Sequence, residues 1–101
     1  MITLHDINII EEETTCTMAE YYQAIQRAIN SGMWGLQGSY GRAMMAAIEE
    51  GYCMLGHKDT HDYWGKHIPS RHQVKAGTKG SFDYVAKAYS EGWAQHMSEL
   101  K

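Results

Sequence analysis

The chain has little cysteine and almost no proline: its 101 residues include two cysteines, Cys16 and Cys53, and one proline. Two cysteines are too few for the disulfide framework of a small secreted domain, which argues against an oxidising compartment. No apolar run approaches the ~18–20 residues that a membrane-spanning helix needs. Residues 1–6 also lack the basic and apolar regions of a secretory signal. We therefore expect a soluble, cytoplasmic protein without a membrane partner.

The chain also lacks an excess of positive charge. Nine Lys and Arg residues stand against twelve Asp and Glu residues, which gives a net charge of -3. Residues 1–20 contain five acids and no Lys or Arg, whereas residues 66–79 contain four cations and no acid. A strongly basic balance is the usual sign of a nucleic-acid-binding domain, so the composition argues against that class. The uneven charge predicts instead that one end of the chain meets a charged partner.

Apolar residues make up 44% of the chain and aromatic residues 11%, which is enough to bury a core. The length fits one compact domain over residues 1–101. Within it, we expect residues 1–16 to form an acidic N-terminal strand or arm, because Ile2 and Leu4 are spaced by two, as are Ile7 and Ile9.

Three segments have the apolar spacing and the capping residues of helices. Thr17 and Glu20 have the form of a capping box, and apolar residues recur behind them at helical spacing, which predicts a helix over residues 18–31. A serine precedes each of two further periodic segments, which predicts helices over residues 40–50 and 82–99.

One or two short strands are expected near residues 2–10 and 52–55, the second from a short apolar run between two glycines. Residues 57–80 show no sustained period, and an irregular stretch of this length inside a compact domain is often functional. The predicted fold class is therefore mainly α with about three helices, and an α+β arrangement stays open.

A cluster of cysteine and histidine residues suggests one alternative function. Cys53, His57 and His61 are spaced by four, and with His72 or His67 they supply the thiolate and imidazole ligands that zinc prefers. A zinc-binding domain is therefore one hypothesis. A zinc hydrolase is not expected, because Lys58 stands where those sites place a catalytic glutamate. No other motif marks a nucleophile or a phosphate cradle, so we expect a protein that is not an enzyme and has no cofactor.

Aromatic and charged residues mark candidate surfaces for a partner. Large aromatic side chains outside the helical stripes are candidate anchors of an interface, and clustered charges would steer association. The expected partner-binding residues are Trp34, Tyr63, Trp64, Lys66, Arg71, Lys75, Lys79, Glu11, Glu12 and Glu13. Aromatic rings mixed with cations are also typical of single-strand binding, so a small nucleic-acid-binding regulator is a further alternative. A homodimer stays open.

The general character of the chain favours a binding protein. A small single domain without a catalytic signature, rich in aromatic residues and methionine, is typical of phage or mobile-element proteins that block a host defence complex, anti-CRISPR proteins among them. On the basis of this general similarity in size and composition, we expect a non-enzymatic domain that inhibits or adapts a larger partner, such as a nucleic-acid-handling complex.

Overall fold

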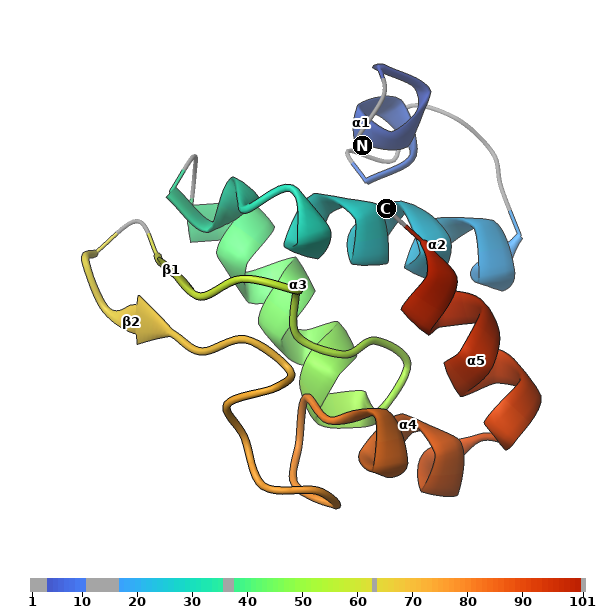
Figure 1. Cartoon of the computed structure of the whole chain (residues 1–101). Helices are drawn as coiled ribbons and strands as arrows, with labels where there is room; N and C mark the ends of the chain where they lie inside the picture. Colours follow the sequence, from blue (N-terminus) through green and yellow to red (C-terminus); the bar gives the residue numbers. More distant parts are fainter. Residues whose placement is uncertain (1–3, 11–16, 36–37, 63, 101) are drawn as a thin grey trace.

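A computed structural model describes residues 4–10, 17–35, 38–62 and 64–100 of the chain (Figure 1). The elements of these residues are, in chain order, α1 (Leu4–Ile10), α2 (Met18–Asn30), the 3-10 turn η1 (Met33–Gly35), α3 (Gly38–Glu50), β1 (Thr60–His61), β2 (His67–Ile68), α4 (Phe82–Ala88) and α5 (Glu91–Glu99). The prediction of a mainly helical fold is confirmed. In the described part of the chain, no helix has both the length and the apolar character needed to cross a membrane.

Helix α2 begins where its capping box predicts. The Thr17 hydroxyl accepts a hydrogen bond from the Glu20 backbone N–H at 3.1 Å, and the Glu20 carboxylate accepts one from the Thr17 N–H at 3.0 Å. These two bonds satisfy N–H groups that the first turn of a helix otherwise leaves unpaired. Gly32, with a φ of 73°, follows the helix in the left-handed conformation that favours glycine. The predicted helix over 18–31 is thus confirmed.

Helix α3 crosses α2 and completes the middle of the core. Its buried residues Met44, Ala47 and Ile48 pack with Ile25 and Ile29 of α2 in one hydrophobic cluster. Removing such apolar side chains from water is the main favourable contribution to folding. The helix predicted over residues 40–50 is confirmed and begins two residues earlier, at Gly38.

The single helix predicted over residues 82–99 is wrong, because the chain turns a corner at Tyr89 and Ser90 (Figure 1). Ser90 has extended backbone angles, with φ -169° and ψ 159°, and its hydroxyl accepts a hydrogen bond from the Trp93 N–H at 3.1 Å. Ser90 therefore ends one helix and caps the next. The apolar spacing continues across this break, which is why the periodicity did not reveal it.

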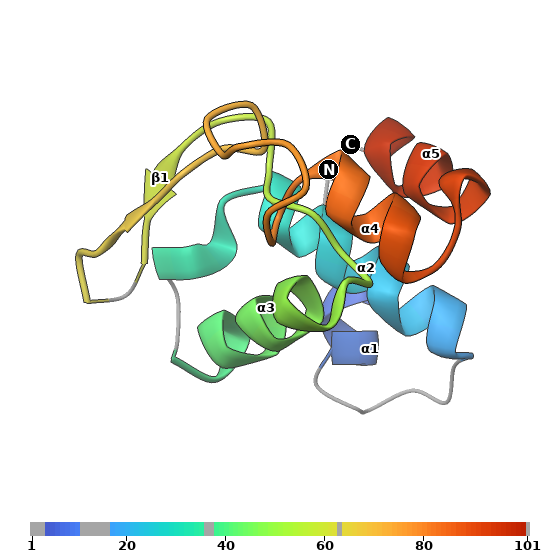
Figure 2. The same cartoon turned by 90° about the horizontal axis from the view of Figure 1, so that it is seen from below.

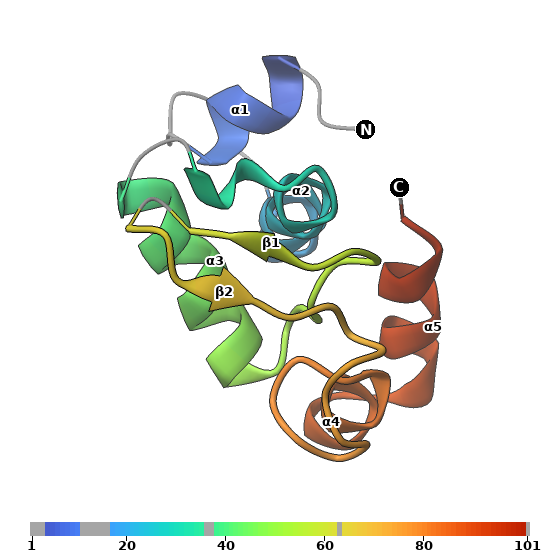
Figure 3. The ribbon, with the colours of Figure 1, turned by 60° about the vertical axis from the view of Figure 1, so that its left-hand side comes forward.

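The strand predicted near residues 2–10 is also wrong over residues 4–10, which form α1. The buried residues Asp6 and Ile9 are three positions apart and so lie on one face of this helix. The Arg27 guanidinium donates to the Asp6 carboxylate at 2.8 Å, which ties α1 to α2, and Figure 3 shows the two helices side by side. The remainder of the predicted acidic arm lies outside the described residues.

The strand predicted near residues 52–55 is wrong as well. Residues 53–56 form a buried segment without regular secondary structure, here called the central loop, which is held by side chains and by single backbone hydrogen bonds to Gly80 and Arg71. The Gln26 amide makes two hydrogen bonds to the Met54 backbone, each 2.9 Å long. The Arg71 Nε donates to the Leu55 carbonyl at 2.7 Å. These bonds satisfy backbone groups that burial would otherwise leave unpaired.

The segment predicted as irregular, residues 57–80, contains a short β-hairpin. Thr60 pairs with Ile68, and His61 pairs with His67, in an antiparallel two-stranded sheet. The hairpin tip is shaped by the Asp62 carboxylate, which accepts hydrogen bonds from the N–H groups of two residues that follow it in the chain. Figure 2 shows that the hairpin projects on the side of the molecule away from α4 and α5.

Candidate functional site

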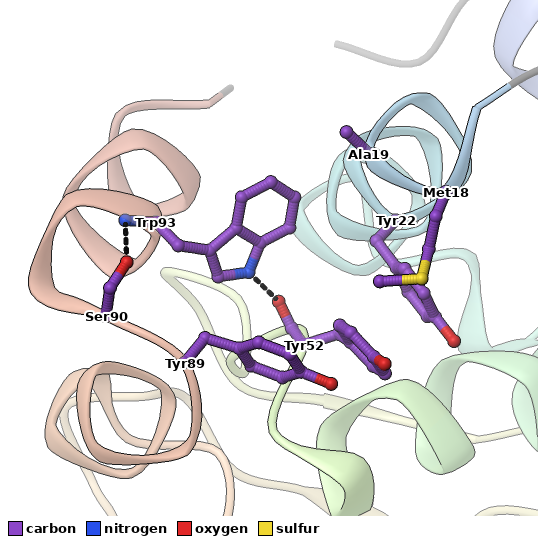
Figure 4. Close-up of a pocket in the computed structure, with 7 residues that line it drawn as sticks. All are labelled: Met18, Ala19, Tyr22, Tyr52, Tyr89, Ser90 and Trp93. Carbon is purple, nitrogen blue, oxygen red and sulfur yellow. Dashed lines mark hydrogen bonds between the residues drawn. The ribbon is translucent and has the colours of Figure 1, made fainter.

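An aromatic groove lies between the first turns of α2 and α5 (Figure 4). It encloses a cavity of about 240 Å³. Its lining residues are Met18, Ala19, Tyr22, Tyr52, Tyr89, Ser90 and Trp93. They come from α2, from the turn after α3 and from the corner between α4 and α5, so the groove forms only when the fold is complete.

Three tyrosine rings form one wall of this groove. Tyr52 stacks on Tyr22 with ring centroids 3.9 Å apart and planes 9° apart. On its other side Tyr52 meets Tyr89, with centroids 4.3 Å apart and planes tilted by 31°. Close ring pairs of this kind add stabilisation beyond their buried area. Figure 4 shows the three hydroxyl groups side by side at one end of the stack.

Trp93 forms the opposite wall, and hydrogen bonds hold it in place. Its indole Nε1 donates to the Tyr52 carbonyl at 2.9 Å, while its backbone N–H donates to the Ser90 hydroxyl. Met18 is 60% exposed and Tyr89 is 44% exposed at the mouth of the groove. The site therefore combines aromatic rings held in fixed positions with an exposed, flexible methionine, a combination that suits recognition of another protein.

The tyrosine hydroxyls lie in an acidic environment. Burial raises the pKa of Tyr22, and the nearby Glu50 carboxylate raises it further. Burial also raises the pKa of Tyr89, with added contributions from its hydrogen bond to Tyr52 and from Glu50. Glu50 itself is exposed at the end of α3, and Glu91 is exposed in the first turn of α5. The hydroxyls of Tyr22 and Tyr89 therefore remain neutral donors at physiological pH, and the Glu50 carboxylate favours a cation near them.

Four of the residues predicted to bind a partner are exposed and do not line the groove. Trp64 is 68% exposed beside the hairpin tip, and Lys66, Lys75 and Lys79 are exposed. Lys66 and Lys79 border a second cavity of about 230 Å³ with an apolar floor. Tyr63 and the run Glu11, Glu12 and Glu13 lie outside the described residues.

Two of the predicted partner-binding residues are corrected by the structure. Trp34 is only 2% exposed, because η1 turns its indole into the hydrophobic core. Arg71 is 8% exposed, because its guanidinium binds the Leu55 carbonyl and the Asn30 side chain inside the fold. Trp34 is therefore a core residue, and most of the Arg71 side chain is held inside the fold by hydrogen bonds.

The structure does not assemble the proposed zinc site. Cys53 is fully buried, and its thiol donates to the Tyr22 carbonyl at 3.3 Å. Burial raises the pKa of this thiol, which disfavours the thiolate that binds zinc. His57, His61 and His72 are instead exposed. Among the described residues, no three His, Cys, Asp or Glu side chains are placed to hold one metal ion.

The aromatic groove was not predicted from the sequence. Tyr22, Tyr89 and Trp93 lie at helical spacing within the segments predicted as helices, where such spacing is typical of core residues, and Tyr52 lies in the segment predicted as a short strand. The one local signal was Ser90, whose position before an acidic residue is typical of a helix cap. Comparisons with models of known families, with curated proteins and with solved structures found no match.

Proposed function

We propose that the protein is a non-enzymatic binding domain whose aromatic groove holds a basic segment of a larger protein, which the domain inhibits or adapts. The observation that carries this proposal is a cavity walled by Trp93 and by the stacked rings of Tyr22, Tyr52 and Tyr89, with the Glu50 carboxylate near enough to act on the hydroxyls of Tyr22 and Tyr89.

The apolar part of the groove accounts for affinity. Trp and Tyr side chains contribute strongly at protein interfaces, because they bury a large area with little loss of conformational freedom, and Met is also enriched there. A cavity of about 240 Å³ accepts a large apolar side chain from a partner segment. Met18, exposed at the mouth, can adjust its conformation to the shape of that side chain.

The acidic edge of the groove accounts for the choice of partner. A Lys or Arg that follows the apolar side chain would place its cation near Glu50 and the phenol oxygens, where a charge-assisted hydrogen bond forms. Basic surfaces are characteristic of proteins that handle nucleic acids. The net charge of -3 favours association with such a surface. The partner class is therefore a nucleic-acid-handling protein, and a phage or mobile-element inhibitor of a host defence complex, of the anti-CRISPR kind, is the corresponding biological role.

Selection from a random peptide library tests this proposal without knowledge of the partner. Peptides that bind the folded chain are expected to share an apolar residue next to Lys or Arg. Replacing Glu50 by Lys should weaken their binding about tenfold, because a charge-assisted contact becomes a repulsion. Asp59→Lys is the matched control, since Asp59 is an exposed acid that directly precedes β1 and does not line the groove.

Two results would overturn the proposal. Selected peptides that carry no cation would exclude a basic partner segment. Peptides that bind Glu50→Lys and Tyr89→Ala as tightly as the natural chain would show that the groove is not where they bind. Chemical shifts of the Trp93 indole N–H give an independent readout, because this group lies in the groove wall.

A second candidate function is a small nucleic-acid-binding regulator, and one observation favours it. Trp64 is 68% exposed at the hairpin tip, and the exposed Lys66 lies two residues further along the chain. An exposed ring beside a cation suits stacking on an unpaired base. Binding to a labelled single-stranded oligonucleotide should then weaken steeply with salt and be lost in Trp64→Ala. Absence of binding at low salt would exclude this candidate.

A further inference from the structure

Arg71 is a buried cation whose partners in the fold are neutral. Its Nε donates to the Leu55 carbonyl at 2.7 Å, and its Nη2 donates to the Asn30 side-chain oxygen at 3.0 Å. The ion pairs formed within the described part of the chain join Arg27 to Asp6 and His67 to Asp59, and neither includes Arg71. Burial without an anionic partner is unfavourable for a charge, and it lowers the pKa of this guanidinium.

The third nitrogen of the guanidinium is directed to the surface. Every buried side-chain nitrogen or oxygen in the described ranges has a hydrogen-bond partner. Nη1 of Arg71 takes part in neither of the two bonds above, so this nitrogen is in contact with solvent. The buried cation therefore presents N–H donors at the surface.

Two histidines flank Arg71 in the fold: His72 follows it in the chain, and His57 follows Gly56, whose carbonyl accepts a hydrogen bond from the Arg71 N–H at 2.9 Å. The rings of His57 and His72 have centroids 6.3 Å apart, and both side chains are exposed. The pKa of His57 is lowered first by burial of part of its ring and then by the charge of Arg71, with a further contribution from His72. The ionisable groups that lower the pKa of His57 are therefore both basic, and within the described residues no carboxylate forms an ion pair with Arg71, His57 or His72.

We propose that Arg71, His57 and His72 form a binding site for an oxyanion of the phosphate class. The two rings leave room for an anion that accepts a hydrogen bond of ~2.8 Å from each of them. The Arg71 nitrogen supplies a third donor and a permanent charge. The hydrogen bonds of Arg71 to Leu55 and Asn30 fix the guanidinium in place, so an anion meets a donor that is already oriented.

This anion site is independent of the aromatic groove. The groove involves the first turns of α2 and α5, whereas Asn30 lies at the end of α2 and its side-chain amide donates to the carbonyl of Leu100, just after α5. The two sites therefore occupy opposite ends of the same pair of helices. Failure of one proposal leaves the other untouched.

Titration with inorganic phosphate, followed through the histidine side-chain resonances in NMR spectra, tests the proposal. Saturable shifts are expected for His57 and His72, and phosphate should raise the pKa of His57, because the bound anion favours the imidazolium form. The double variant His57→Gln with His72→Gln should bind phosphate about tenfold more weakly. Both side chains are exposed, so this variant is expected to fold.

The hairpin supplies a matched control. His61 and His67 form a second exposed pair, with ring centroids 5.7 Å apart, but Asp59 accompanies them instead of a buried arginine. Their resonances should not shift, and His61→Gln with His67→Gln should bind phosphate like the natural chain. Equal shifts at both pairs, shifts that do not saturate, or unchanged affinity in the His57 and His72 variant would each overturn the site.

Discussion

The Gln26 side chain pairs with both backbone polar groups of Met54: its Nε2 donates to the Met54 carbonyl, and its Oε1 accepts from the Met54 N–H. Gln26 and Met54 are both fully buried. The amide thus takes the place that a neighbouring strand would take beside the central loop. A buried polar side chain of this kind contributes to stability, because the buried groups that it pairs with cannot form hydrogen bonds to water instead.

Replacing Gln26 by Leu should destabilise the fold by about 3 kcal/mol, because both polar groups of Met54 would be left buried without a partner. Urea unfolding measures the change. Gln95→Leu is the control, since Gln95 is exposed on α5 and bonds to Glu99, and it should cost less than about 0.5 kcal/mol. Equal losses for the two variants would contradict the importance of the Gln26 pairing.

Gly80 and Gly77 separate the effect of backbone strain from that of crowding. Both have a positive φ, 93° and 87°, but a Cβ on Gly80 would lie 2.6 Å from a Leu55 methyl carbon, whereas a Cβ on Gly77 would meet nothing within 4 Å. Gly77→Ala should cost about 1 kcal/mol from strain. Gly80→Ala should cost about 2–4 kcal/mol, because the clash with Leu55 adds to the strain. Thermal unfolding of the two variants would show no difference if Leu55 moved aside freely.

The buried thiol of Cys53 predicts a loss of stability in alkaline solution. Its pKa is raised in the folded protein, so above pH ~8.5 the unfolded chain loses this proton while the folded chain keeps it. The free energy of unfolding should therefore fall as pH rises from about 8.5 to 10, by up to about 1.4 kcal/mol per pH unit from this group. Cys53→Ala should show a shallower fall, and an identical slope in the two proteins would refute the effect.

The cap at Ser90 links helix stability to the groove. Ser90→Ala should cost about 1 kcal/mol, because the Trp93 N–H loses its acceptor at the start of α5. The same change should weaken binding of the selected peptides, since Trp93 is a wall of the groove. Ser98→Ala is the control: it removes a serine from the same helix without removing a cap. Calorimetry and peptide affinity measured on both variants check the two effects.

The elements that sequence patterns predicted well are those defined by short-range contacts. The capping box of Thr17 and Glu20 joins residues within one helical turn, so the sequence alone predicts where α2 begins. The Ile-rich residues 4–10 have the intrinsic propensity of a strand but form helix α1. As a helix, this segment pairs Asp6 with Arg27 and buries Ile9. Tertiary contacts of this kind join distant parts of the chain and leave no local pattern.

The candidate site was hidden for the same reason. Tyr22, Tyr52 and Tyr89 are separated by 30 or more residues, and each fits an ordinary core position within its own segment. The opposite holds for Trp34 and Arg71: a place outside the helical stripes predicts an exposed Trp34, and the basic run over residues 66–79 predicts an exposed Arg71, but both are buried. Nothing in their neighbourhood in the sequence signals the core packing of Trp34 or the acceptors Leu55 and Asn30 that surround Arg71.

The pairing of the central loop with side chains has a practical consequence for anyone who grafts an epitope or a reporter into this chain. One residue inserted between Cys53 and Gly56 would move Met54 out of register with Gln26 and Leu55 out of register with Arg71. The exposed turn at residues 75–77 has open space at Gly77, and the hydrogen bonds that close it, from the Thr78 N–H to the Lys75 carbonyl and from the Gly77 N–H to the Ser81 hydroxyl, join residues within the same turn. Insertions belong there, where the chain can lengthen while its interior stays aligned.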